Sequence, residues 1–248
     1  PNGSNAGELL TVIDKCPHSR GSMDMRRLAI VLLFGTIVGC GIGQAREAAR
    51  RSQCKNNLKQ IGLALHNYHD EFRSFPPAFV ADENGTPMHS WRVLLLPYLD
   101  HQKLYDQYDL SQPWDSPANQ AVLNNMPAIF ACPSGTPGNT TNYAGVFGAD
   151  CIFTGAEVTK VADCKDGLSN TLVVGEVDGS AIPWTKPEDI DISKYPDLSD
   201  PAGFHSSHTG GMHFLLADGS VRFVSEQINP QTLKALFTRD GEEIVGEF

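Results

Sequence analysis

The sequence predicts an α+β fold in which a long N-terminal helix packs on an antiparallel β-sheet. Apolar residues recur at spacings of three and four residues between 44 and 72, at Leu58, Ile61, Leu65, Tyr68 and Phe72. This spacing places them on one face of a helix. After residue 140 the pattern changes to short segments rich in β-branched and aromatic residues, which is typical of strands.

Several shorter elements follow the helix, which Pro76-Pro77 ends. The pattern predicts one or two short helices over residues 90–99, broken at Pro97 and continued over 101–108. It also predicts a helix over 119–125, a short strand over 129–132 and a loop over 184–203. A terminal helix is predicted over 231–237, after Asn229-Pro230.

The strand-like segments are residues 142–147, 172–177 and 212–216. Segments 212–217 and 220–225 flank Asp218-Gly219, which is a strong hairpin signal. We expect a type I′ turn there, with positive φ at both central residues.

Charge is distributed unevenly along the chain, whose formal net charge is −10. Residues 44–60 carry five basic side chains and one acidic side chain, whereas residues 61–248 carry 10 basic and 25 acidic side chains. An acidic body repels phosphate backbones, so we expect no nucleic-acid partner. The basic stretch is either a solvated helix face or a contact with anionic lipid headgroups.

The N-terminal 43 residues read as a leader, signal or membrane anchor that precedes an extracytoplasmic domain over 44–248. Arg26-Arg27 is followed by an apolar run over 28–39 and then by Cys40. This arrangement predicts an export signal. Residues 37–40 resemble a lipobox, which makes Cys40 the candidate lipidation site; an uncleaved signal anchor and a secreted form are the alternatives. Residues 1–22 resemble neither a signal nor a domain, and we expect them not to be native coding sequence.

Six cysteines are present, of which Cys54, Cys132, Cys151 and Cys164 lie in the expected exported domain. Four cysteines allow three connectivities. We expect the bridges Cys54–Cys132 and Cys151–Cys164, because an exported domain folds in an oxidising compartment. Buried free thiols are the alternative. The absence of a CxxC motif excludes a zinc ribbon.

Several motifs together resemble a bacterial family known as domain of unknown function 1559. They are Ala45–His69 followed by Phe75-Pro76-Pro77, Trp91–Tyr98, Phe130–Ser134, Thr141–Tyr143, Asp166–Thr171 with Gly175-Glu176, Pro183–Asp189, and His208 followed nine residues later by Asp218-Gly219. The last of these is the H-X9-DG signature of the family.

The resemblance implies a pilin- or pseudopilin-like fold with an enlarged C-terminal β region. It also implies a membrane-anchored, extracytoplasmic location, at the periplasm or cell surface, with envelope or pilin-like proteins or glycans as partners. One departure stands out: Arg26-Arg27-Leu28-Ala29 replaces the Gly-Phe-Thr-Leu-Val-Glu stretch of members with a prepilin leader. This departure argues against prepilin processing and fibre assembly.

Two sets of side chains are candidate binding residues. Tryptophan beside acidic residues is typical of sugar or calcium sites, which points to Glu176, Trp184, Lys186, Glu188 and Asp189. Histidines three residues apart can share a divalent metal with a carboxylate, which points to His205, His208 and Asp218. Turn capping and satisfied polar packing are the favoured explanation of these three residues.

The expected function is that of an envelope-anchored, pseudopilin-like structural or binding protein without a catalytic residue. The alternatives are a carbohydrate- or calcium-binding module and a hydrolase that uses Glu176 with His205 or His208. No GxGxxG, GxSxG or HExxH motif is present, which argues against the common nucleotide-binding and hydrolase sites.

Overall fold

A computed structural model describes residues 25–135 and 137–243, and for residues 25–42 it describes the helical backbone alone. The α-helices are α1 (Met25–Phe72), α2 (Trp91–Leu94), α3 (Gln102–Tyr105), α4 (Gln120–Leu123) and α5 (Pro230–Phe237). The strands are β1 (Phe79–Ala81), β2 (Pro87–Ser90), β3 (Tyr143–Phe147), β4 (Leu172–Glu176), β5 (Ile190–Asp191), β6 (Gly211–Leu216) and β7 (Val221–Ser225). Short 3-10 helices span Leu96–Leu99, Ala128–Phe130, Val161–Asp163 and Leu168–Asn170.

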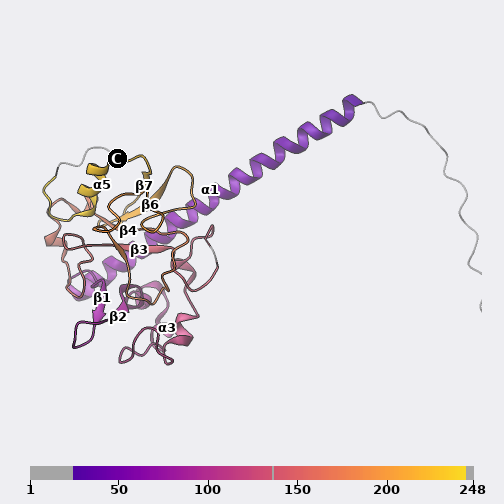
Figure 1. Cartoon of the computed structure of the whole chain (residues 1–248). Helices are drawn as coiled ribbons and strands as arrows, with labels where there is room; N and C mark the ends of the chain where they lie inside the picture. Colours follow the sequence, from indigo (N-terminus) through magenta and orange to yellow (C-terminus); the bar gives the residue numbers. More distant parts are fainter. Residues whose placement is uncertain (1–24, 136, 244–248) are drawn as a thin grey trace, which may run out of the picture. The chain divides into compact units, whose positions relative to one another are not determined.

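Five strands form the main sheet, in the order β5-β3-β4-β6-β7. Figure 1 labels β3, β4, β6 and β7 of this sheet. All neighbours pair antiparallel except β3 and β5, which are parallel. A separate antiparallel hairpin joins β1 to β2. The α+β prediction is therefore confirmed, with one parallel pair at the edge of the expected antiparallel sheet.

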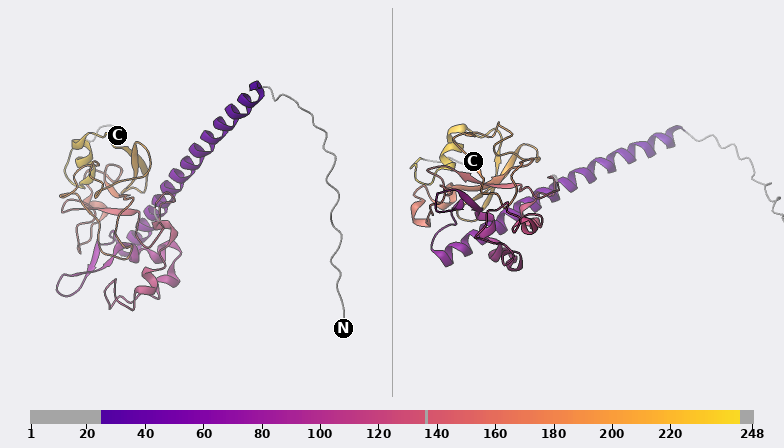
Figure 2. Two further views of the ribbon diagram at one scale, coloured as in Figure 1. Left: turned by 45° about the vertical axis from the view of Figure 1, so that its right-hand side comes forward. Right: turned by 60° about the horizontal axis from the view of Figure 1, so that its bottom comes forward.

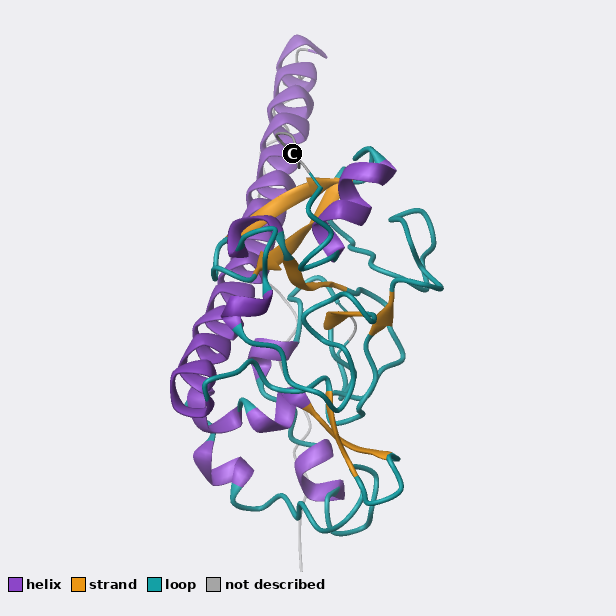
Figure 3. Ribbon diagram, turned by 90° about the vertical axis from the view of Figure 1, so that its left-hand side faces the viewer, coloured by secondary structure: helices purple, strands orange, loops and turns teal. Residues whose placement is uncertain are grey.

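The part of α1 that follows residue 45 packs along one face of the sheet (Figures 2 and 3). Leu58, Ile61 and Leu65 are at most 2 % exposed, as the helical spacing predicts. They share a core cluster with Leu215 and Ala217 of the β6–β7 hairpin. Phe72 is 54 % exposed, so the buried face of the helix ends about one turn earlier than predicted.

The opposite face of the sheet is covered by α5 (Figure 3). Leu233, Leu236 and Phe237 of this helix share a second core cluster with Phe214 and Leu216 of β6. Successive residues of β6 thus face different helices, as the two-residue period of a strand requires. The sheet is the middle layer between the two helices.

The β6–β7 turn lies against α1. A Cβ atom added to Gly62 would lie 2.7 Å from Leu215 Cδ1 and 3.4 Å from Gly219 Cα, and a Cβ on Gly219 would lie 3.4 Å from the His66 ring. The hairpin prediction is confirmed, but the type I′ turn is wrong, because Gly219 has a φ of +82° whereas Asp218 is not among the residues of positive φ. A three-residue loop with glycine in the left-handed region fits this geometry.

The remaining predictions differ from the structure in detail. The helices expected over 101–108 and 119–125 are present in shortened form, and the segment 90–99 forms α2 followed by a 3-10 helix. The helix expected over 231–237 is present as α5, which begins one residue earlier. The strand predicted over 129–132 is wrong, because residues 128–130 form a 3-10 helix before Pro133. Strand β5 lies inside the predicted loop over 184–203, and the β1–β2 hairpin was not predicted, although Asn84-Gly85 at its turn is a hairpin signal. In the part of the chain whose side chains are described, no helix is long and apolar enough to cross a membrane.

A buried ion pair joins α2 to the sheet edge. The Arg92 side chain is fully buried and donates from Nη2 to Asp189 Oδ1 at 2.6 Å. Asp189 also accepts from Trp91 Nε1 at 3.0 Å and from the Gly145 amide of β3 at 2.7 Å. Burial raises the pKa of Asp189, and the Arg92 guanidinium opposes that shift. The carboxylate therefore ties α2, β3 and the segment before β5 to one another.

We expect Gly62→Leu to destabilise the domain by about 1–3 kcal/mol, because the added side chain must displace Leu215 or the turn. Gln60→Leu is the matched control, since residue 60 is exposed on the same helix. Urea unfolding followed by circular dichroism measures both variants. Equal effects of the two leucines would contradict the close helix–hairpin contact.

We expect Arg92→Met to cost about 3–5 kcal/mol of unfolding free energy, because it leaves the Asp189 carboxylate buried without its cation. Lys186→Met is the control, since Lys186 and Glu188 form an ion pair with side chains 40 % and 47 % exposed. Exposed pairs contribute about 0–1 kcal/mol. Chemical denaturation measures both variants. A larger loss of unfolding free energy in Lys186→Met than in Arg92→Met would contradict this assignment.

Candidate functional site

Three segments far apart in the sequence bring two thiols and an imidazole together. Cys54 lies on the buried face of α1, one turn before Leu58; Cys132 follows the 3-10 helix Ala128–Phe130; and His208 precedes β6. Cys54 Sγ and Cys132 Sγ are 2.8 Å apart, and Cys132 Sγ lies 3.9 Å from His208 Nε2. Their potential ligand atoms all lie within 4.8 Å of one another. Cys54, Cys132 and His208 form what we term the thiol–imidazole cluster.

A carboxylate of α1 orients the imidazole of this cluster. His208 Nδ1 lies 2.6 Å from Glu47 Oε1, and the His208 side chain is fully buried. Because an ionised carboxylate only accepts hydrogen bonds, Nδ1 carries the proton that is donated to Glu47. The hydrogen bond from His208 lowers the pKa of Glu47. The other ring nitrogen, Nε2, therefore faces the sulfurs.

A second carboxylate borders the cluster from β4. Glu176 Oε2 accepts the backbone amide of His213 at 2.8 Å, while Oε1 lies 3.3 Å from His213 Nδ1 and 3.8 Å from His208 Nε2. Burial raises the pKa of Glu176, but the contacts with His213 outweigh burial and hold it below the ordinary value. Glu176 is therefore an ionised carboxylate inside the protein, 2 % exposed.

Hydrogen bonds from neighbouring amide groups hold the chain around Cys132 in place. The Cys132 amide donates to Asn142 Oδ1 at 2.8 Å, and the Ser134 amide donates to Cys132 Sγ at 3.4 Å. Asn57 Nδ2 of α1 donates to the Ala131 carbonyl at 3.0 Å. A hydrogen bond from the Cys54 thiol lowers the pKa of Cys132 to about 7. Cys132 is thus the more acidic thiol of the pair.

The structure corrects both predicted disulfides. All four cysteines of the domain are free thiols. The first prediction does identify two adjacent cysteines, but their 2.8 Å separation exceeds an S–S bond of about 2.05 Å. Cys151 and Cys164 pack in different core clusters, where burial raises their pKa values to about 12 and 11. The prediction failed because sequence spacing does not show which face of the sheet a thiol faces.

The three residues of the predicted metal set have different surroundings. Only His208 of this set enters the cluster, since His205 and Asp218 are exposed. Asp218 Oδ1 accepts the Ser220 amide at 2.8 Å, as a turn residue does. The sequence did not predict that Cys54 and Cys132 lie beside His208, because neither cysteine belongs to a short Cys/His motif; for His208 the H-X9-DG signature was the available signal.

The predicted sugar or calcium group does not form a single site. Trp184 is fully buried, stacks on Phe130 with ring centroids 5.7 Å apart, and donates from Nε1 to the Leu123 carbonyl. A buried indole offers no face to a sugar. Glu176 belongs to the environment of the thiol–imidazole cluster, and Lys186 pairs with Glu188 at the surface.

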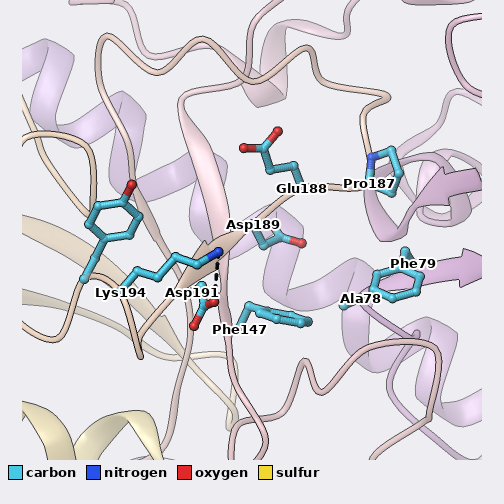
Figure 4. Close-up of a pocket in the computed structure, with 9 residues that line it drawn as sticks. Ala78, Phe79, Phe147, Pro187, Glu188, Asp189, Asp191 and Lys194 are labelled. Atoms are coloured by element: carbon cyan, nitrogen blue, oxygen red, sulfur yellow. Dashed lines mark ion pairs between the residues drawn. The ribbon is translucent and has the colours of Figure 1, made fainter. Parts of the chain in front are cut away.

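Part of the predicted group lines a surface pocket of about 250 Å³ (Figure 4). Its walls are Ala78, Phe79, Phe147, Pro187, Glu188, Asp189, Asp191, Lys194 and Tyr195. Asp191 pairs with Lys194 at 3.4 Å, while Glu188 pairs with Lys186 and Asp189 with Arg92. Each acidic side chain of the pocket therefore has a cationic partner.

The structure does not describe the side chain of Cys40, the predicted lipidation site, or the side chains of the apolar segment around it. Residues 1–22 also lie outside the described part of the chain. Both predictions stay predictions.

Comparison with known proteins gives one match. No curated protein and no solved structure matches the chain. A family model described as a protein of unknown function, DUF1559, matches residues 43–145, 134–194 and 185–231. These segments cover well over half of the chain and include the thiol–imidazole cluster. The chain therefore belongs to the DUF1559 family.

Proposed function

We propose that this chain is an envelope-anchored, pilin-like protein that acts by binding or by structural assembly, on the extracytoplasmic side of a membrane. The observation that carries the proposal is the burial of Leu58, Ile61 and Leu65 of α1 (Met25–Phe72) in the domain core. This helix begins in the sequence region that carries the apolar run over 28–39 and Cys40. Its second half packs in the core of the folded domain.

The burial of this helix ties it firmly to the domain. The buried residues Leu58, Ile61 and Leu65 fix the second half of α1 in the domain core. A lipid or signal anchor near the N-terminus would then be joined by the chain to this buried helix. The helix cannot leave the domain unless the core is lost. Such an anchor-to-domain helix is the arrangement that the pilin-like resemblance implies.

Binding or assembly is favoured over catalysis by the state of the expected catalytic residues. Glu176 and His208 are 2 % and 3 % exposed, and both already have hydrogen-bond partners inside the protein. A substrate would have to displace these contacts. The acidic body also favours envelope proteins or glycans over nucleic acid as partners.

Fractionation of cells that express the full chain tests the anchor. We expect the full chain in the membrane fraction and a variant without residues 26–39 outside it. For a lipoprotein, Cys40→Ala blocks incorporation of labelled palmitate, whereas Cys164→Ala leaves it unchanged. Recovery of the full chain from the soluble fraction, with no mass added at Cys40, would refute the proposed anchoring.

A second candidate function is carbohydrate binding at the pocket of Figure 4. Phe79, Phe147 and Tyr195 supply aromatic faces at its wall. Glu188 and Asp191 supply acceptors whose charge is offset by lysines, which favours a neutral polar ligand over calcium.

A glycan array with the full chain tests this candidate, followed by calorimetry on any ligand found. We expect Tyr195→Ala to weaken binding about tenfold or more, because it removes a pocket wall. Tyr105→Ala, on α3 outside the pocket, is the control. An array without binding, or equal losses in both variants, rules the pocket out as a carbohydrate site.

A further inference from the structure

We propose that Cys54, Cys132 and His208 form a binding site for a soft or borderline d-block cation such as zinc, with Glu176 placed to complete the coordination. The inference does not depend on the anchoring proposal, because every ligand lies in the folded domain.

The donor set is the first argument. Two thiolates and one imidazole are the ligands that zinc and monovalent copper prefer over calcium or magnesium. All three donors are buried: Cys54 is 0 % exposed, Cys132 is 8 % exposed and His208 is 3 % exposed. They come from three separate segments, which the fold brings together.

The hydrogen bond from His208 to Glu47 is the second argument. Metal-bound histidines commonly donate their other ring nitrogen to a carboxylate, which fixes the tautomer and turns the free nitrogen toward the metal. Here His208 Nδ1 contacts Glu47 at 2.6 Å. Nε2 lies 3.8 Å from Glu176 Oε1, too long for a good nitrogen–oxygen hydrogen bond, and its contact with Cys132 Sγ at 3.9 Å is a weak hydrogen bond to sulfur.

The required movement is small. Tetrahedral zinc with Zn–S bonds of about 2.3 Å places two sulfurs roughly 3.8 Å apart. The Cys54 and Cys132 sulfurs, at 2.8 Å, must therefore separate by about 1 Å. Binding deprotonates both thiols and releases the two protons to solvent. The cation then faces two thiolates, while Glu47 and Glu176 add negative charge close by.

An entry path adjoins the cluster. A surface pocket of about 360 Å³ is lined by Glu47, Arg50, Pro133, Ser134 and Ser207. Three of these residues are sequence neighbours of Cys132 or His208, and Glu47 is the hydrogen-bond partner of His208. Glu47 stands at the boundary between this pocket and the buried imidazole, since its own side chain is 32 % exposed.

Zinc titration of the full chain, solubilised and fully reduced, tests the proposal against a chromophoric chelator. We expect one zinc per chain. Cys54→Ser, Cys132→Ser and His208→Gln should each weaken binding about 100-fold or more, and Glu47→Gln by about 10–100-fold because it only orients the ligand. Cobalt substitution should produce a thiolate charge-transfer band that Cys54→Ser and Cys132→Ser reduce.

Cys164→Ser is the matched control, because Cys164 is 9 % exposed and outside the cluster. It should bind zinc as the parent chain does, and circular dichroism must show each variant folded. The proposal is overturned if the reduced parent retains no equimolar zinc, or if Cys164→Ser weakens zinc binding as much as Cys54→Ser does. It is also overturned if the protein isolated from cells contains no metal and has a disulfide between Cys54 and Cys132.

Discussion

The contact between α1 and the β6–β7 hairpin is the constraint on which the rest of the domain depends. A glycine in the helix, Gly62, allows Leu215 and the Gly219 turn to approach the helix backbone. Leu58 and Ile61 bury their side chains beside this contact. Because the helix is thereby fixed against the sheet, residues of its earlier turns are fixed as well.

This constraint explains the H-X9-DG signature in physical terms. His208 contacts α1 at Glu47, and Gly219 contacts it at His66. A rise of 1.5 Å per residue separates those two helix positions by about 28 Å. The eleven steps from His208 to Gly219 span at most about 36–40 Å when extended. The spacing in the signature is therefore long enough to follow the helix between these two contacts, and His208 lies beside Cys54.

The sequence could predict the local elements but not the long-range site. Helical spacing identified Leu58, Ile61 and Leu65 as core residues, and Asp218-Gly219 identified the hairpin, because both signals are local. Trp184 was mistaken for a ligand platform, since its neighbours in sequence are acidic while its neighbours in space are Phe130 and Leu123. The thiol–imidazole cluster joins residues more than 70 positions apart, so no local pattern could place His208 next to the cysteines.

The central claim is that α1 stays packed against the sheet in the folded domain. Native-state hydrogen exchange along α1 tests this claim most directly. Amides of residues 54–65 should exchange only through global unfolding, at the same free energy as the amides of β6, because their side chains fill the common core. Exchange over 54–65 that is much faster than in β6 would show that the helix detaches from a folded sheet. That result would contradict the account.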